Sequence, residues 1–318
     1  MKILSRLVLG CLVVVATLLP MTDEAQAKAQ RYKPFVLAWR GQGDFDAKVE
    51  ETRQKLEDAG FTIVAVFDPY KDATHVDDAR VIVVTTDALK KVAAKSKYGG
   101  FAAPQRVAVT KVGDEIQVSY YNPVYMALAY RLKDDLSNTA AMLEKALGKV
   151  EEYGSKKGLT ARKLKKYHYT FGMEYFDEPY VLAKYGSYKE AVAAVEKNLA
   201  SNDVGVRKVY RIDIPGKEET VFGVSRQAPD GGDKHMDDDW ILGTVDFEPL
   251  KVTAYLPYEV MVTGNKVIAL HMRFRMAVSR PDLKMMGKNS FMNLMPSPAA
   301  VKKALTLAVG GKVEEIEY

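Results

Sequence analysis

The sequence predicts an α+β protein built from two tandem, related two-layer α/β sandwich units with mostly antiparallel sheets, arranged as an internal pseudo-dimer. Three observations support this prediction: apolar residues at helical spacing, β-branched strands around Gly-Asp or Gly-Asn turns, and a repeat of both patterns along the 318 residues. Helices mixed with hairpins are typical of an antiparallel sheet covered by helices. We divide the chain into a signal peptide (1–27), a first α+β unit (28–150), a basic and aromatic connector (151–180) and a second α+β unit (181–318).

The first 27 residues have the three parts of a secretory signal peptide. Lys2 and Arg6 make a basic start, an apolar run follows from Leu7 to Leu19, and Ala25-Gln26-Ala27 supplies small residues two apart. The apolar run is shorter than the roughly 20 residues that a spanning helix needs. We therefore expect cleavage near Ala27, a periplasmic or secreted protein, and no transmembrane segment in the mature chain.

Cysteine usage and charge narrow the function classes. Cys11 is the single cysteine and lies in the apolar run, so one alternative is a lipoprotein modified at Cys11. The other alternative to cleavage near Ala27 is an uncleaved membrane anchor. The mature chain then has no disulfide, thiolate metal site, cysteine nucleophile or thioether-linked haem. A formal charge of +5 gives no nucleic-acid footprint, but it permits weak contact with a membrane surface or with acidic ligands.

The first unit shows its elements in order. Apolar residues from Val49 to Ala59 recur at helical spacing, and Gly60-Phe61 leads into a strand over Thr62–Phe67. Pro104–Thr110 and Glu115–Tyr121 form a hairpin around a Gly-Asp turn.

The second unit repeats these elements. Val192 to Leu199 predicts a helix, Arg207–Ile212 a strand, and Pro257–Thr263 with Lys266–Met276 a hairpin around Gly264-Asn265. Four matches in the same order argue for a tandem duplication. The matched segments are 59–61 with 204–206, 104–110 with 257–263, 115–121 with 266–276, and 143–147 with 301–305.

The helix, Gly-Phe, strand, Pro-x-x-Val-x-Val and hairpin pattern resembles the domain-of-unknown-function family 302. The matching segments are 56–67, 104–109 and 118–123, with a weaker match over 256–262. The resemblance implies a compact two-layer α+β fold that tends to pair into dimers, and it implies no established activity. Relatives often carry a cysteine after the proline of this motif; Gln105 and Tyr258 stand there in this chain, so a thiol-based role cannot apply.

The first candidate ligand site is the row His271, Arg273 and Arg275. If Lys266–Met276 is a strand, these three side chains share one face and the alternate apolar residues share the other. Arginine forks match planar anions, so the row predicts binding of an anionic ligand or an acidic partner surface. The arginines should oppose protonation of His271 and keep it neutral near pH 7. The alternative is an exposed face paired with nearby carboxylates.

The connector supplies a second candidate ligand site, Tyr167, His168 and Tyr169. These rings could stack on a planar ligand or help to bind haem. The alternative is that they pack against a neighbouring domain.

A candidate metal site comprises His235, Asp237 and Asp239. Their nitrogen and oxygen atoms are ligands that divalent cations accept, although the spacing does not match an EF-hand loop. The alternative is a solvated acidic loop. Methionines between positions 261 and 295 could select Cu(I), but they lack a regular Met-x-x-Met array and two of them are expected in the core.

Enzymatic motifs are largely missing, and no motif requires a cofactor. Glu174 with Asp177 and Glu178 could act in general acid–base catalysis. The alternative is that these acidic loop residues are simply exposed to solvent. The sequence therefore favours a non-catalytic binding or assembly module for a small ligand, with an anion as one candidate, or for an envelope protein partner. The alternatives are a periplasmic hydrolase or transferase with a site between the units, and a structural partner of a membrane complex.

Overall fold

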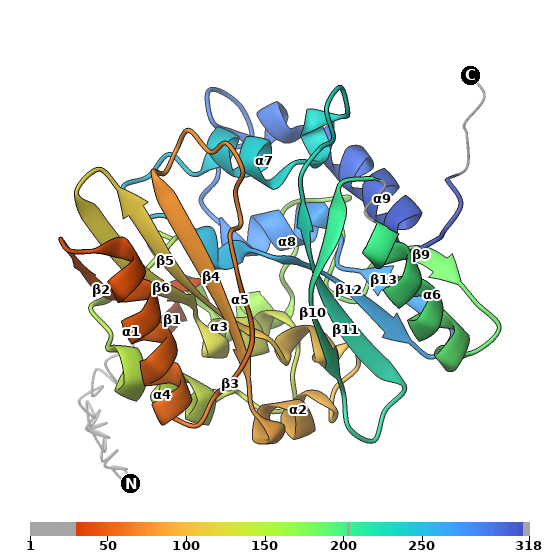
Figure 1. The fold of residues 1–318 in the computed structure, drawn as a ribbon, viewed down its shortest axis with the longest axis horizontal. Helices are drawn as coiled ribbons and strands as arrows, with labels where there is room; N and C mark the ends of the chain where they lie inside the picture. Colours follow the sequence, from red (N-terminus) through yellow and green to blue (C-terminus); the bar gives the residue numbers. More distant parts are fainter. Residues whose placement is uncertain (1–29, 202–203, 314–318) are drawn as a thin grey trace, which may run out of the picture. The chain divides into compact units, whose positions relative to one another are not determined.

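Two large antiparallel sheets organise residues 30–201 and 204–313, which the computed structural model describes (Figure 1). The first sheet contains β2 (Phe35–Gly41), β3 (Thr62–Phe67), β4 (Asp78–Thr85), β5 (Gln105–Val112), β6 (Glu115–Tyr121) and β7 (Glu151–Tyr153). Its strand order is β3-β4-β5-β6-β2-β7. β2, the first strand of this sheet in sequence, therefore lies between β6 and β7. A separate small sheet pairs β1 (Arg31–Tyr32) with β8 (Leu159–Thr160).

The second large sheet has the same strand order as the first. Its strands are β9 (Tyr180–Lys184), β10 (Val206–Asp213), β11 (Glu219–Arg226), β12 (Tyr258–Thr263) and β13 (Lys266–Ala269). They are arranged β10-β11-β12-β13-β9, which corresponds strand for strand to β3-β4-β5-β6-β2. Val107 of β5 and Val260 of β12 are each the third residue of the corresponding strand.

Each large sheet is covered on one face by a pair of helices. In the first sheet these are α1 (Phe45–Asp58) and α4 (Ser137–Leu147); in the second they are α6 (Tyr188–Ser201) and α9 (Ser297–Ala308) (Figure 1). Asp44 starts α1 because its carboxylate accepts the amide N–H of Ala47. Alternation of side chains along the strands then directs the other face of each sheet inward, where it joins one shared core.

Short helices connect the strands. They are α2 (Asp87–Ala93), η1 (Gly99–Ala102), α3 (Pro123–Ala129), α5 (Ala161–Lys165), η2 (Lys234–Met236), α7 (Asp238–Val245), η3 (Thr253–Tyr255), α8 (Met272–Ser279) and η4 (Phe291–Leu294). Two of them pack across the molecule in a reciprocal way: η1 contacts β11 and β12, whereas η3 contacts β4, β5 and β6. A side chain at Gly100 would lie 2.8 Å from the sulfur of Met261, so η1 needs glycine for this close approach. Residues 31–201 and 204–313 form one compact unit.

The structure confirms the α+β class, and the predicted strands Thr62–Phe67 and Glu115–Tyr121 have the predicted bounds. The predicted strand Lys266–Met276 is wrong. The strand ends at Ala269, and α8 begins at Met272 after the imidazole of His271 accepts the N–H of Arg273. Because α8 is buried on almost every side, it has no polar face, and its sequence lacks the 3.6-residue pattern that reveals a surface helix.

Candidate ligand-binding site

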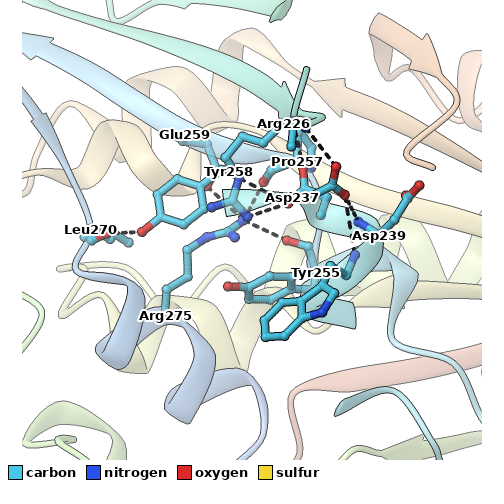
Figure 2. Close-up of polar contacts among 12 residues, drawn as sticks. Arg226, Asp237, Asp239, Tyr255, Pro257, Tyr258, Glu259, Leu270 and Arg275 are labelled. Carbon is cyan, nitrogen blue, oxygen red and sulfur yellow. Dashed lines mark hydrogen bonds and ion pairs between the residues drawn. The ribbon is translucent and has the colours of Figure 1, made fainter. Parts of the chain in front are cut away.

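The orientation of α8 is set by a buried arginine. Arg275 is 1% exposed, and its guanidinium lies between the rings of Tyr255 and Tyr258, 4.1 and 4.4 Å from their centroids. It donates to the carbonyl oxygens of Tyr255, at 2.7 Å, and Pro257 (Figure 2). Its Nη2 also lies 3.2 Å from Oε2 of Glu259. These contacts hold α8 against the start of β12. They therefore fix the position of the residues at the N-terminus of α8.

A second arginine reaches the same carboxylate from the first sheet. Arg106 of β5 donates from Nη1 to Oε1 of Glu259, and both residues are almost fully buried. Burial of a charge is tolerated only with a partner. Glu259 therefore neutralises part of the charge of two arginines and links the two sheets at their centre.

Three polar side chains meet at the N-terminus of α8. Oε1 of Glu174 lies 3.1 Å from Nε2 of His271. The same carboxylate accepts Nε of Arg273 at 3.0 Å, and Nη2 of Arg273 as well. The ring of His271 also lies on Tyr180, with 4.0 Å between centroids. This group joins the connector, β9 and α8, and we call Glu174, His271 and Arg273 the polar cluster.

The imidazole of His271 is held neutral. Burial lowers its pKa to about 4, and the nearby Arg273 and Lys302 act in the same direction, against the opposing effect of Glu174. Because Nδ1 accepts the N–H of Arg273, the proton of the neutral ring resides on Nε2 and is donated to Glu174. The imidazole therefore acts as a helix cap and a hydrogen-bond donor at neutral pH.

The polar cluster borders a cavity of about 620 Å³, which we call the methionine pocket. Its lining is mainly apolar and draws on the connector, β9, α8 and the segment that ends in α9. The residues that line it are Met173, Glu174, Glu178, Pro179, Tyr180, Val181, His271, Met272, Arg273, Met276, Met285, Phe291, Leu294, Met295, Pro298, Ala299 and Lys302. A pocket of this size with few polar groups is typical of small-molecule sites, and thioether side chains adapt to irregular ligands.

The charges around the methionine pocket differ in how well they are paired. Arg273 is engaged by Glu174 through two nitrogen atoms, so its fork is occupied. Glu178 accepts the amide N–H of Tyr175 at 2.9 Å. Lys302 forms no ion pair with another residue in the described part of the chain. Its ammonium, 5.9 Å from the ring of Tyr180, is the cation available to a ligand.

The predicted row His271, Arg273 and Arg275 is only partly brought together. His271 and Arg273 border the methionine pocket, but Arg275 points into the core. Residues two apart share a face in a strand and diverge by about 200° in a helix, which explains the separation. The prediction that His271 is neutral agrees with its lowered pKa, but burial rather than the arginines is the main cause.

Tyr167, His168 and Tyr169 do not form a common site. Tyr167 donates to the carbonyl of Ala277 at 2.8 Å, and Tyr169 to that of Leu283 at 3.1 Å. The half-buried ring of His168 instead lies 4.5 Å from that of Tyr175, and its Nδ1 is 2.9 Å from the carbonyl oxygen of Thr170. The two tyrosines therefore attach the connector to α8 and to the segment that follows it.

The predicted metal site at His235, Asp237 and Asp239 is wrong as a cluster. Asp237 caps α7 by accepting the N–H groups of Asp239 and Trp240. The carboxylate of Asp239 accepts two backbone N–H groups from residues 71 and 72, and His235 pairs with Asp233. Within residues 30–201 and 204–313, no group of three or more His, Cys, Asp or Glu side chains is placed to hold a metal ion.

Sequence reasoning missed two residues of the pocket wall. In the sequence, Glu174 stands in an acidic group with Asp177 and Glu178, whereas its partner Arg273 is 99 residues away. Lys302 and Lys303 are neighbouring exposed lysines of α9. Only the packing of α9 on β9 shows that Lys302 lines the pocket and that Lys303 does not. The concentration of methionines near the C-terminus was the one available signal for the pocket.

Comparison with known proteins identifies one domain. In the part of the chain that the structure describes, no helix is both long and apolar enough to cross a bilayer. Searches of curated proteins and of solved structures give no significant match. The family model "Domain of unknown function DUF302" matches residues 38–150, which extend from β2 to the residue before β7. Residues 38–150 are therefore similar to this family, in agreement with the resemblance predicted from the sequence.

Proposed function

We propose that this chain is a non-catalytic binding protein for a small amphipathic anion, which it takes up in the methionine pocket. The apolar body of the ligand lies on the thioether and aliphatic side chains, and its anionic group faces Lys302. The single observation behind this proposal is an apolar cavity of about 620 Å³ with one lysine that has no ion-pair partner among the described residues.

The polarity of the ligand follows from the pairing of the charges. A ligand that fills the pocket removes water from Lys302, and an unpaired ammonium in an apolar surrounding is unfavourable. A neutral ligand would leave this charge unpaired, whereas a carboxylate or sulfonate pairs with it. The polar cluster is already paired internally, so it serves as a rigid wall beside the ligand.

The test uses decanoate and decanol, which share an apolar chain and differ in the charged end. Isothermal titration calorimetry on the mature protein should show binding of decanoate that is tighter than that of decanol. Lys302→Met should weaken decanoate by about fivefold, because ion pairs at partly exposed positions contribute up to ~1 kcal/mol. The same substitution should leave decanol unchanged. Lys303→Met, on the neighbouring position of α9, is the matched control.

A second variant tests the cavity itself. Ala299 is exposed at the start of α9 and lines the pocket, so Ala299→Trp should fill it and abolish binding of both probes. Ala193→Trp places the same side chain on the exposed surface of α6 and should have no effect. Unchanged binding in Ala299→Trp, or equal affinity for the two probes, would show that the pocket is not the site or that the ligand is not an anion. Failure of both probes together with specific retention of a protein partner would favour an assembly module.

We also propose that the protein acts outside the cytoplasm, in the periplasm or as a secreted protein. Support comes from the basic start, apolar run and Ala25-Gln26-Ala27 of the sequence, which lie outside the described residues. An exported binding protein for an amphipathic anion would meet its ligand in the envelope. A hydrolase or transferase remains the alternative, and Glu174 beside His271 would be its candidate acid–base pair.

We further propose that the second unit is a divergent copy of the DUF302 domain, so that the chain is an internal pseudo-dimer. The equal strand order of the two sheets and the reciprocal packing of η1 and η3 support this proposal. In a two-fold arrangement, each copy contacts the other through the same surface. Expression of residues 28–150 alone tests it: the isolated unit exposes the face that η3 covers, and we expect it to self-associate.

A further inference from the structure

A second cavity lies at the other end of α8. Its volume is about 720 Å³, and its lining comes from the link between β1 and β2, the end of β7 and the segment after it, the segment between α7 and η3, and the segment after α8. The residues that line it are Lys33, Tyr153, Gly154, Ser155, Lys156, Val245, Phe247, Glu248, Pro249, Leu250, Val252, Arg280, Asp282, Leu283, Lys284, Lys288 and Asn289. His271 caps the N-terminus of α8 at the methionine pocket, and Arg280 is the C-cap residue of α8 at this second cavity. Because several lysines line it, we call it the basic cavity.

The basic cavity carries an excess of positive charge. Lys33, Lys156, Lys284 and Lys288 line it, and none of these lysines forms an ion pair with another residue of the described ranges. Two carboxylates, those of Glu248 and Asp282, lie in the same lining. Four lysines against two carboxylates leave two positive charges without compensation.

Arg280 adds a buried donor to this lining. Its side chain is more than nine-tenths buried, and Nη1 donates to the carbonyl oxygen of Val245 at 2.9 Å. Nη2 lies 3.2 Å from Oδ1 of Asp246, so the charge of Arg280 is balanced by a residue behind it. Nε of Arg280 has no hydrogen-bond partner within the described residues. Because this atom is shielded from water, Arg280 forms part of the cavity wall, and the lysines are the cations that a ligand can reach.

The shape of the cavity is maintained independently of the lysines. Asp282 accepts Oγ of Ser155 at 3.2 Å and the backbone N–H of Lys156 at 2.5 Å. These bonds join the segment after β7 to the segment after α8. Apolar side chains between α7 and η3 complete the wall, and Phe247 among them is 52% exposed. The cavity therefore combines a basic rim with an apolar surface that includes one accessible ring.

We propose that the basic cavity binds a phosphate monoester, with the phosphate among Lys156, Lys284 and Lys288 and the organic part against Phe247. A phosphate monoester carries ≈ −1.5 to −2 charges near pH 7, which matches the uncompensated charge, and it brings several strong acceptor oxygens. A monocarboxylate would leave one lysine charge unpaired. A cavity of this volume also exceeds the space that one inorganic anion occupies, which favours an ester with an organic body.

The first experiment compares phenyl phosphate, inorganic phosphate and benzoate by calorimetry on the mature protein. Phenyl phosphate should bind most tightly, since it satisfies both the basic rim and the ring of Phe247. Phe247→Ala should weaken phenyl phosphate and leave inorganic phosphate unchanged. Benzoate that binds as tightly as phenyl phosphate would overturn the assignment of a doubly charged ligand.

The second experiment removes the charges. The double variant Lys284→Gln/Lys288→Gln should weaken phenyl phosphate by about tenfold or more, because charge-assisted hydrogen bonds are among the stronger polar contacts. Lys189→Gln/Lys197→Gln removes two exposed lysines from α6 and is the matched control for net charge. Equal loss in both double variants would mean that only the overall charge matters, and the proposed site would be wrong. Decanoate binding should remain in both variants, which separates this site from the methionine pocket.

A phosphate monoester can belong to a soluble molecule or to a lipid headgroup. Co-sedimentation with phosphatidylcholine vesicles, with and without phosphatidic acid, distinguishes these sources. Binding to the phosphatidic acid vesicles that is lost in Lys284→Gln/Lys288→Gln indicates a lipid headgroup. Binding of phenyl phosphate without vesicle binding indicates a soluble ester, and failure of both overturns the proposal.

Discussion

Arg106 and Glu259 occupy the same position in the two sheets and form an ion pair with each other. Each is the second residue of its strand, β5 or β12, and both side chains are almost fully buried. Arg106 reaches Oε1 of Glu259, and Arg275 of α8 approaches Oε2. One carboxylate therefore serves two buried guanidinium groups where the two halves meet.

This arrangement predicts unequal effects when either partner is removed. Glu259→Gln leaves two buried arginines without a carboxylate, and we expect a loss of about 3–5 kcal/mol in the free energy of unfolding. Arg106→Met leaves Glu259 paired with Arg275, and we expect a smaller loss, within the roughly 0.5–3 kcal/mol of ordinary substitutions. Urea denaturation followed by circular dichroism measures both values.

The double variant Arg106→Met/Glu259→Met provides the control. If the pair were isolated, replacing both partners would recover most of the stability. Because Arg275 also depends on Glu259, we expect the double variant to stay close to Glu259→Gln. Recovery to near the wild-type value would contradict the shared role of Glu259.

The lowered pKa of His271 predicts a stability change in mildly acidic solution. Its folded-state pKa of about 4 lies below the ordinary value of 6.5, so the unfolded chain binds the proton first as pH falls. The stability associated with the neutral ring is complete above pH ~6.5 and is lost between about 6.5 and 4. His271→Asn keeps a side chain that can cap α8 and removes this titration.

The comparison of wild type and His271→Asn isolates this group, because Glu174, Arg273 and Lys302 are present in both proteins. Thermal melts at intervals from pH 7.5 to 4.5 should show a smaller decline in Tm for the variant. Parallel curves for the two proteins would show that His271 is not protonated differently in the folded and unfolded states.

Asp237 should act as a helix cap and not as a metal ligand. Asp237→Ala removes the acceptor for the N–H groups of Asp239 and Trp240, and should lower the free energy of unfolding by about 0.5–2 kcal/mol. Asp237→Asn should retain most of the stability. Melts of the wild type with Zn²⁺ and with a chelator should give the same Tm; a Zn²⁺-dependent rise that is absent in Asp237→Ala would restore the metal site.

The first 28 residues should be sufficient for export. A fusion of residues 1–28 to a reporter enzyme should deliver the reporter to the periplasm of a bacterial host and release it in processed form. Fractionation and N-terminal sequencing should place the cleavage near Ala27. Full-length fusion that remains in the inner membrane would contradict both cleavage and release.

The sequence by itself determined the order and type of most elements. Strands such as Thr62–Phe67 and Glu115–Tyr121 are preceded by glycine turns, and helices such as α1 and α6 have one buried and one exposed face, so local patterns are sufficient to identify them. Residues 12–318 contain no cysteine, so the sequence alone excludes thiol chemistry in that part of the chain. These properties depend on short stretches of chain, and short stretches retain their preferences wherever they pack.

Only the tertiary structure decided the nature of α8 and the composition of both cavities. A helix that is buried on nearly all sides has no polar face, so Met272–Ser279 looks like the continuation of a strand in sequence alone. The partners Glu174 and Arg273 are 99 residues apart, and Arg106 and Glu259 are 153 residues apart. The tertiary structure decides which charged side chains form ion pairs and which lysines have no ion-pair partner among the described residues. The reason is that the partner of a buried charge can come from any part of the chain that the fold places next to it.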